Sequence, residues 1–326
     1  MKVAITGGAG FIGANLVRAL RMAEPSWQIT VIDNLSTGCR ANLDGIDDVI
    51  VYEASILDDV ALDAAFEIAD AVVHLAARPS VQRSVVDPLT SHEVNATGTV
   101  RVLDAARRAS VGHVVVASSA SVYGDGMLQR LPKHEGLAVA PLSPYAASKL
   151  AAESYALAYA HCNRVPVLVF RLFSVFGPLQ PAGHAYAAAI PAFIAAAMKG
   201  RPIPIFGDGL QTRDFTYVGS LCSVIVDALR RKVASDRPVN LAFGTRRTLL
   251  DVVDMLSDVL GTPLERMHAS GRPGEVRHSE ADPSRLRALF PDVAPVEFRT
   301  GLEATINWYQ THQYGREGAI LELVRP

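Results

Sequence analysis

The sequence predicts an α/β fold, a doubly wound parallel sheet followed by a smaller, discontinuous domain. Three observations predict it. A short apolar run at residues 3–6 leads directly into a glycine-rich segment at residues 7–13. Uninterrupted apolar runs then alternate with helical patterns over the first half of the chain, which is typical of a parallel sheet covered on both faces. After residue 172, several prolines interrupt this alternation.

The expected strands follow one another at residues 3–6, 28–32, 49–52, 71–76, 113–118 and 167–172, and a strand at 239–243 returns to the same sheet. Helical spacing marks residues 95–108 and 145–161. Residues 249–260 form an amphipathic pattern that Thr248 can cap and Gly261 can end. We therefore predict a first domain at residues 1–172 with about 213–243, and a second at 173–212 and 244–326.

The glycine-rich segment has the pattern of a turn that holds a pyrophosphate. Gly7, Gly10 and Gly13 let backbone approach phosphate closely, and the following helix supplies N–H groups and partial positive charge. Asp33 closes the second strand, where a carboxylate accepts hydrogen bonds from ribose hydroxyls and repels a 2′-phosphate. This pattern predicts a Rossmann-type domain that binds NAD rather than NADP. The alternative is a flavodoxin-like turn without a cofactor.

The composition limits the partners. The net charge of -2 gives no electrostatic case for nucleic acid or an anionic membrane. No apolar stretch has the length of a membrane span, and the alanine-rich segment 185–197 is expected to be a helix. Cys39, Cys162 and Cys222 are dispersed and odd in number, which favours reduced thiols in a cytoplasmic protein and no metal site.

Three groups of residues point to hydride chemistry. Tyr145 and Lys149 share one helical face, so the ammonium can bias the tyrosine toward phenolate and lower its pKa from about 10. Ser119 follows an apolar strand, where its hydroxyl can donate or relay a proton. His74 is expected to be a packed core histidine, and Asn95 to order water or bond an adjacent strand. The alternatives are a solvated Tyr–Lys face and a turn serine.

Taken together, these motifs resemble an extended short-chain dehydrogenase/reductase of the NAD-dependent nucleotide-sugar epimerase/dehydratase family, similar to UDP-hexose 4-epimerases. GGAGFIG, segment 33–38, HLAA, SSASVYG and YAASK occur in the family's order. The resemblance implies a catalytic trio of Ser119, Tyr145 and Lys149. It also implies NAD-binding residues, namely Gly7, Gly10, Phe11, Ile12, Gly13, Asp33, Asn34, Ser36, Thr37, Gly38, Ser55, Ile56, Leu75, Ala76, Ala77, Asn95, Ser118, Tyr145 and Lys149.

The second half resembles the family's nucleotide-sugar-binding domain. Segments 171–178, 204–215 and 272–279 match its substrate loop and its two nucleotide clamps. Arginine forks bind phosphate bidentately, which makes Arg213 and Arg272 the clamp candidates, followed by Arg277. Glu275 could accept from ribose hydroxyls. The substrate-binding residues implied by the resemblance are Ser80, Ser119, Ala120, Ser121, Tyr145, Ser174, Ile205, Arg213, Arg272, Glu275 and Ser279.

Several positions favour one reaction within the family. Dehydratases carry an Asp-Glu pair where Ala120 and Ser121 stand, and decarboxylases use a nearby Glu that is absent here. Reversible oxidation at C4 of a UDP-hexose remains, which is 4-epimerisation. Ser174 replaces the Asn of glucose/galactose epimerases and favours UDP-glucuronate/UDP-galacturonate, whereas Ser279 leaves space for an acetamido group.

Other interpretations stay open at this point. They are a UDP-glucose/UDP-galactose or UDP-N-acetylhexosamine 4-epimerase, a nucleotide-sugar decarboxylase or reductase, and a non-catalytic NAD-binding regulator. The choice between UDP and dTDP is also open.

The resemblance further implies a homodimer in which helices 95–108 and 145–161 pair with their copies in a four-helix bundle. Both segments are rich in alanine, which allows helices to approach closely. The alanines concerned are Ala96, Ala105, Ala106, Ala147, Ala151, Ala152 and Ala156. The alternative is that both helices simply pack on their own sheet.

Overall fold

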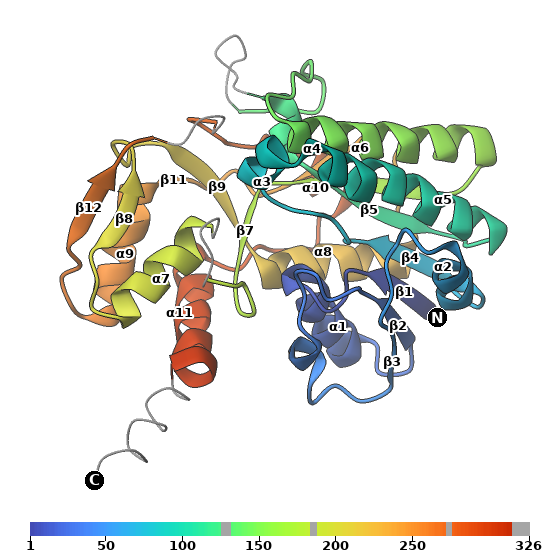
Figure 1. Cartoon of the computed structure of the whole chain (residues 1–326), viewed down its shortest axis with the longest axis horizontal. Helices are drawn as coiled ribbons and strands as arrows, with labels where there is room; N and C mark the ends of the chain where they lie inside the picture. Colours follow the sequence, from blue (N-terminus) through green and yellow to red (C-terminus); the bar gives the residue numbers. More distant parts are fainter. Residues whose placement is uncertain (125–131, 183–187, 272–275, 315–326) are drawn as a thin grey trace.

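The computed structural model describes residues 1–124, 132–182, 188–271 and 276–314 of the chain. Figure 1 shows two lobes of unequal size. The larger contains most of the N-terminal half and the chain's N-terminus, whereas β8, β12, α7, α9 and α11 form the smaller one. The α/β fold with a doubly wound parallel sheet, predicted from the sequence, is confirmed.

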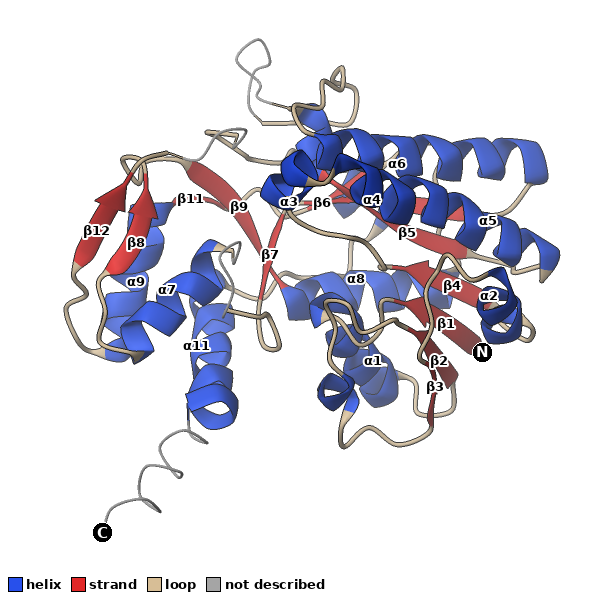
Figure 2. Cartoon of the chain, viewed as in Figure 1, coloured by secondary structure: helices blue, strands red, loops and turns tan. Residues whose placement is uncertain are grey.

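The larger lobe is built on a seven-stranded sheet whose neighbouring strands are all parallel (Figure 2). Its strands are almost uniformly apolar because both faces are covered. In their order across the sheet they are β10 (Val239–Leu241), β6 (Val167–Leu172), β5 (Val114–Ser119), β4 (Ala71–His74), β1 (Lys2–Thr6), β2 (Gln28–Ile32) and β3 (Val49–Tyr52).

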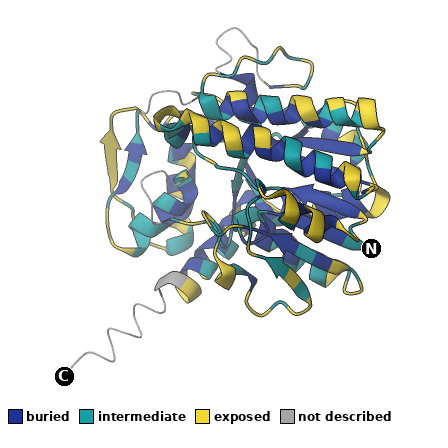
Figure 3. Cartoon of the chain, turned by 45° about the vertical axis from the view of Figure 1, so that its right-hand side comes forward, coloured by how far each residue is buried: buried dark blue, intermediate teal, exposed yellow. Residues whose placement is uncertain are grey.

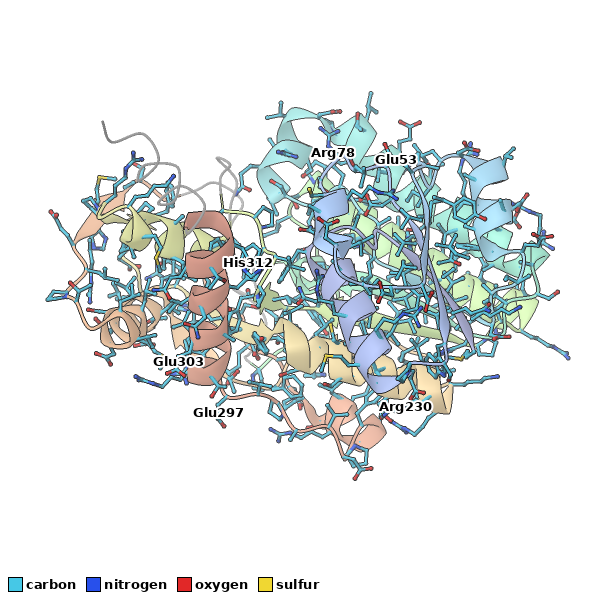
Figure 4. The ribbon with its side chains drawn as sticks, turned by 90° about the horizontal axis from the view of Figure 1, so that it is seen from below. Glu53, Arg78, Arg230, Glu297, Glu303 and His312 are labelled. Atoms are coloured by element: carbon cyan, nitrogen blue, oxygen red, sulfur yellow. The ribbon has the colours of Figure 1, made fainter. Side chains whose placement is uncertain are left out.

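Two hydrophobic cores lie on the two faces of this sheet, and its strands are buried in Figure 3. One face packs against α1 (Phe11–Ala23), α8 (Val218–Arg231) and α10 (Ser284–Leu289), the other against α2 (Asp59–Phe66), α5 (Gly98–Arg108) and α6 (Pro144–Asn163). Arg230 of α8 pairs with Glu24, directly after α1 (Figure 4). Short elements connect these helices: α3 (Val81–Val86), α4 (Pro88–His92), a π-helical turn (Glu93–Thr97) and 3-10 turns at Arg40–Leu43 and Ala120–Tyr123.

The smaller lobe has its own core. Its elements are β7 (Ser174–Phe176), α7 (Ala189–Met198), β8 (Ile203–Phe206), β9 (Thr212–Tyr217), β11 (Arg246–Thr248), α9 (Leu249–Leu260), β12 (Arg266–Ala269), α11 (Phe298–Tyr309) and a π-helical turn (Gln310–Tyr314). Helix α9 begins and ends as predicted. Thr248 and Asp251 form a reciprocal capping box, and Gly261 ends the helix with φ 66°.

The chain passes between the lobes more than once after residue 172. Strand β9 pairs with β7 and β11, whereas α8, directly after it, packs on the main sheet. Leu286 and Phe290, in and after α10, join the core around α1 and α8. The predicted domain limits therefore remain a prediction, and α10 contacts the first lobe. In the parts of the chain described, no helix combines the length and apolar character that a membrane crossing requires.

The alanines expected at a dimer interface are mostly used within the monomer. Ala147 is exposed and Ala151 is partly buried. The other five are buried in the single chain, namely Ala96, Ala105, Ala106, Ala152 and Ala156. Helices α5 and α6 pack against each other and against their own sheet in the single chain. The homodimer itself stays a prediction.

Candidate active site

Two cavities meet at the carboxyl ends of the parallel strands, where ligands of doubly wound sheets bind. The larger, of about 770 Å³, follows the ends of β1, β2, β4 and β5. The smaller, of about 460 Å³, lies between the two lobes. Ser119, Phe173 and Gln180 line both cavities. A molecule in one cavity can therefore reach a molecule in the other at Ser119.

The glycine turn forms one wall of the larger cavity. Gly7 has φ 72°, and a Cβ there would stand 2.7 Å from the backbone nitrogen of Ala76. A Cβ on Gly13 would stand 2.2 Å from the carbonyl oxygen of Gly7. Helix α1 starts at Gly10 without a side-chain cap. The turn thus brings bare backbone and the start of α1 to the cavity, which suits a pyrophosphate.

Asp33 is held rigidly beside this turn. Its carboxylate is 8% exposed and accepts hydrogen bonds from the backbone N–H of Ala9 and of Leu35, each at 2.9 Å. Each carboxylate oxygen keeps acceptor capacity, and Asp33 lines the larger cavity. Asp33 thus stands at the cavity with acceptor capacity, and its hydrogen bonds to ribose hydroxyls stay a prediction.

Most of the remaining predicted cofactor residues line the same cavity, namely Phe11, Ile12, Asn34, Ser36, Thr37, Ser55, Ile56, Leu75, Ala76, Ala77 and Ser118. Gly38 and Asn95 do not. Gly38 packs against the backbone of Ala9. Asn95 is buried and accepts from the backbone N–H of Arg78 at 2.7 Å while donating to the hydroxyl of Ser148 at 3.0 Å. Asn95 thus ties the loop after β4 to α6.

Arg78 and Arg83 follow the HLAA segment, where we expected either of them to add positive charge near a carboxylate of the sugar. Arg78, labelled in Figure 4, forms an ion pair with Asp87 at 2.6 Å, and both residues line the cavity together with Arg83. Asp87 also caps α4 by accepting from the N–H of Thr90. Both arginines therefore line the larger cavity rather than the smaller one.

Helix α6 carries Tyr145 and Lys149 to the larger cavity. Ser143 caps the helix by accepting from the N–H of Ala146 at 3.1 Å. Burial raises the pKa of Tyr145, and a hydrogen bond with Ser119 partly offsets this effect. In the protein chain by itself desolvation is thus the larger effect, and the lowering expected from Lys149 together with the positive nicotinamide of bound NAD stays a prediction. Burial lowers the pKa of Lys149 to about 8, and the charge of Glu153 opposes this shift.

His74 is a buried structural histidine, as predicted. Its Nδ1 lies 2.7 Å from the hydroxyl of Thr6, and its Nε2 lies 2.9 Å from that of Thr99. Because Thr99 donates its own proton to the carbonyl of Asn95, it accepts from His74, which assigns the proton to Nε2. Burial lowers the pKa of His74 to about 3, so the ring is neutral.

The smaller cavity gathers six of the predicted substrate residues: Ser119, Ala120, Ser121, Ser174, Arg213 and Ser279. Ser121 donates its hydroxyl to that of Ser119 at 2.9 Å. Ser80 and Ile205 line neither cavity. Ile205 points into the core because residues alternate along β8, and Pro204 and Phe206 face the cavity instead. Arg272 and Glu275 lie outside the described residues.

Lys133 is a group that sequence reasoning missed. It lines the smaller cavity but is only 1% exposed, and its ammonium donates to the carbonyl of Gly124 at 3.0 Å. A backbone bridge to Ala281 fixes it from the far end of the chain. This long-range contact has no local sequence signal.

The two cavities join at the edge of a doubly wound sheet, and a tyrosine, a lysine and a serine lie around the junction. This arrangement is typical of a dinucleotide-dependent enzyme. The model of the NAD dependent epimerase/dehydratase family matches residues 3–242. The chain belongs to this family, and NAD is its cofactor. The family predicted from the motifs is therefore confirmed.

Named relatives refine this assignment. The UDP-glucose 4-epimerase of Mycolicibacterium smegmatis is 33% identical over 95% of this chain and 99% of its own length. The UDP-glucuronate 4-epimerase of Thermodesulfobacterium geofontis is 32% identical over 93% of this chain and 94% of its own. A solved UDP-N-acetylglucosamine 4-epimerase from Methanobrevibacter ruminantium, in complex with UDP-N-acetylmuramic acid, superposes with a TM-score of 0.89. It is 32% identical and covers 96% of this chain and 99% of its own.

Proposed function

We propose that this protein is a UDP-hexose 4-epimerase. The observation that carries the proposal is the junction of the two cavities. Tyr145 and Lys149 line the cofactor cavity, Ser119 lines both cavities, and Tyr145 is hydrogen-bonded to Ser119. A sugar in the smaller cavity can thus present one carbon to the cofactor and to the proton-transfer groups together.

Each residue has a defined task in this reaction. Tyr145 takes the proton from the 4-hydroxyl and later returns one, directly or through Ser119. Lys149, beneath it, stabilises the phenolate as a fixed positive charge. When bound, NAD supplies the hydride acceptor and donor at C4, so the sugar undergoes no net oxidation. Rotation of the 4-keto sugar before hydride return inverts the centre, while Arg213 anchors the diphosphate.

Dehydration, the other reaction in the family's name, lacks its acid–base groups here. Ala120 has no titratable group, and the hydroxyl of Ser121 is bonded to Ser119. Among the described residues that line the smaller cavity there is no carboxylate. The chain thus offers no described group to eliminate water across C5 and C6, which supports epimerisation.

Product analysis tests the proposed reaction. Purified protein supplied with NAD and UDP-sugars should yield the C4 epimer without accumulating NADH, as followed by chromatography and absorbance. Tyr145→Phe removes the ionisable oxygen and should lower turnover at least ~10²-fold, with NAD affinity retained. Net NADH formation, or near-normal turnover of Tyr145→Phe, would contradict the mechanism.

For the sugar, we propose the UDP-glucuronate/UDP-galacturonate pair. A desolvated carboxylate at C6 needs hydrogen-bond donors. The hydroxyls of Ser121 and Ser174 and the buried ammonium of Lys133 line the same cavity and offer donors and positive charge. Against this, the substrate loop continues from Pro178 as Leu179-Gln180, without the arginine that uronate enzymes often place there.

Two substitutions make the uronate proposal testable. Ser174→Asn and Lys133→Met should each depress turnover of UDP-glucuronate more than turnover of UDP-glucose. Each substitution removes a proposed hydrogen-bond donor to the C6 carboxylate, and UDP-glucose has no such carboxylate. Ser26→Asn, at an exposed position in the turn before β2 that lines neither cavity, is the matched control and should change neither. If the unaltered enzyme converts UDP-glucose and leaves UDP-glucuronate untouched, the uronate proposal is wrong and the epimerase proposal stands.

A second sugar class has one observation in its favour. Ser279 is a small residue on the wall of the smaller cavity, which leaves space for a bulky substituent such as an acetamido group. The relative from Methanobrevibacter ruminantium is a UDP-N-acetylglucosamine 4-epimerase. Replacing Ser279 by Tyr should then abolish turnover of the N-acetylated sugar before that of UDP-glucose.

A further inference from the structure

Beneath the cofactor cavity lies a buried charged pair that the reaction as described does not use. Arg171 of β6 donates through Nε and Nη2 to the two carboxylate oxygens of Glu153 on α6, at 2.9 and 2.5 Å. Ser118 of β5 donates its hydroxyl to the same carboxylate at 2.9 Å. The side chains of Glu153 and Arg171 are only 4% and 5% exposed. A buried ion pair stabilises a fold weakly or not at all compared with apolar residues of similar volume, so its position suggests another use.

That position is defined by helix α6. Tyr145, Lys149 and Glu153 follow one another at intervals of four residues, so each side chain lies one turn beyond the last. Lys149 and Glu153 are both buried. The ammonium of Lys149 thus stands between the proposed proton-transfer residue and a carboxylate that two strands hold in place.

The other groups around Lys149 do not supply a negative charge. His74 of β4 is neutral, and burial raises the pKa of Tyr123, in the 3-10 turn after β5, to about 12. Arg171 of β6 is positive, and Asn95 of the π-helical turn is an amide. Arg78, in the loop after β4, and Asp87, the N-cap of α4, form their own ion pair at the cavity wall. Among these described groups, Glu153 is the carboxylate whose charge acts on Lys149, and it does so while Arg171 and Ser118 hold its two oxygens.

We propose that Glu153 is a positioning residue of the reaction, the fixed counter-charge that keeps Lys149 protonated in its buried place, and that Arg171 and Ser118 hold this carboxylate in register. Hydrogen bonds from Ser118 of β5 and Arg171 of β6 then fix the orientation of the Glu153 carboxylate relative to Lys149. The inference concerns Lys149 itself and holds whichever UDP-sugar the enzyme converts.

The direction of the pH effect follows from the sign of the charge. The pKa of Lys149 lies near 8, below its ordinary value of 10.5, so the ammonium is lost as pH rises through this value. Removing a neighbouring negative charge favours the neutral amine further. In Glu153→Gln, the titration of Lys149 should therefore move to lower pH, by about one unit or more.

The test follows Lys149 directly. Protein labelled with ¹³C at the lysine Cε is titrated by NMR from pH 6 to 10, with the Lys149 signal assigned through Lys149→Arg. Turnover is measured across the same range. In Glu153→Gln both the NMR midpoint and the alkaline limb of turnover should shift downward together. An unmoved NMR midpoint in folded Glu153→Gln protein would overturn the proposal and leave Glu153 a structural partner of Arg171.

Arg171→Met is the matched control, because it breaks the same ion pair and should lower the melting temperature in the same direction. It leaves the carboxylate facing Lys149, so the Lys149 midpoint should stay or rise. A downward shift in Arg171→Met equal to that in Glu153→Gln would also refute the proposal. If Glu153→Gln does not fold, the double variant Glu153→Gln/Arg171→Met removes the pair as neutral residues, and its midpoint should lie below that of Arg171→Met, which differs from it only in the carboxylate. A midpoint equal to that of Arg171→Met would again refute it.

Discussion

Gly13→Ala should damage the cofactor site without touching any catalytic group. The added Cβ would stand 2.2 Å from the carbonyl oxygen of Gly7 and 2.6 Å from Cα of Gly8, where ordinary contacts begin at 3.4 Å. Both neighbours are backbone atoms of the turn, so no flexible side chain can yield. The turn must then move by about 1 Å to restore normal contact distances.

Two opposing effects set the magnitude. Alanine is favoured over glycine within a helix by roughly 0.5–1 kcal/mol. Overpacking against rigid neighbours costs about 1–3 kcal/mol, so a net destabilisation of about 1 kcal/mol is expected. A displacement of this size at a binding site can lower turnover about 10²-fold, and we expect NAD affinity to fall at least tenfold.

The assay is NAD titration by calorimetry together with thermal denaturation. Gly112→Ala is the control, because a Cβ there meets only the carbonyl oxygen of Asp70, at 3.4 Å. It should leave NAD affinity unchanged. If Gly13→Ala binds NAD within twofold of the unaltered protein, the turn does not form the phosphate site and the reasoning fails.

Three further outcomes are expected. Asp33→Ala should relax the preference for NAD over NADP in competition titrations, and equal affinity in the unaltered protein would refute the role of the carboxylate. The protein should be a homodimer by light scattering, and Ala147→Arg on the exposed face of α6 should give a monomer whereas Met22→Arg on α1 should not. A monomeric unaltered protein at micromolar concentration would reject the dimer. Because burial lowers the pKa of His74 from 6.5 to about 3, the unfolded chain binds a proton that the native state excludes, so stability is full above pH 6.5 and falls as pH drops toward 3. His74→Gln should flatten this slope of melting temperature against pH, and an unchanged slope would show that other groups cause it.

Local patterns in the sequence determined the sheet, the glycine turn and the Tyr145–Lys149 pair. Each depends on residues close together in the chain: an apolar run makes a strand buried on both faces, and a four-residue interval places two side chains on one helical face. Thr248 and Gly261 limited α9 for the same reason, since a cap is a contact within one turn.

Only the tertiary structure decided what depends on contacts between distant segments. Ile205 points into the core rather than the cavity because its neighbours on α7, α9 and α11 cover that face of β8. Lys133 reaches the sugar cavity because a bridge to Ala281 fixes it there, and Glu153 is held by Ser118 and Arg171 from two strands. The direction of the Tyr145 pKa shift also depends on the tertiary structure, because desolvation is caused by all the groups packed around the phenol. Local sequence sets backbone conformation, but burial and long-range pairing are properties of the assembled chain.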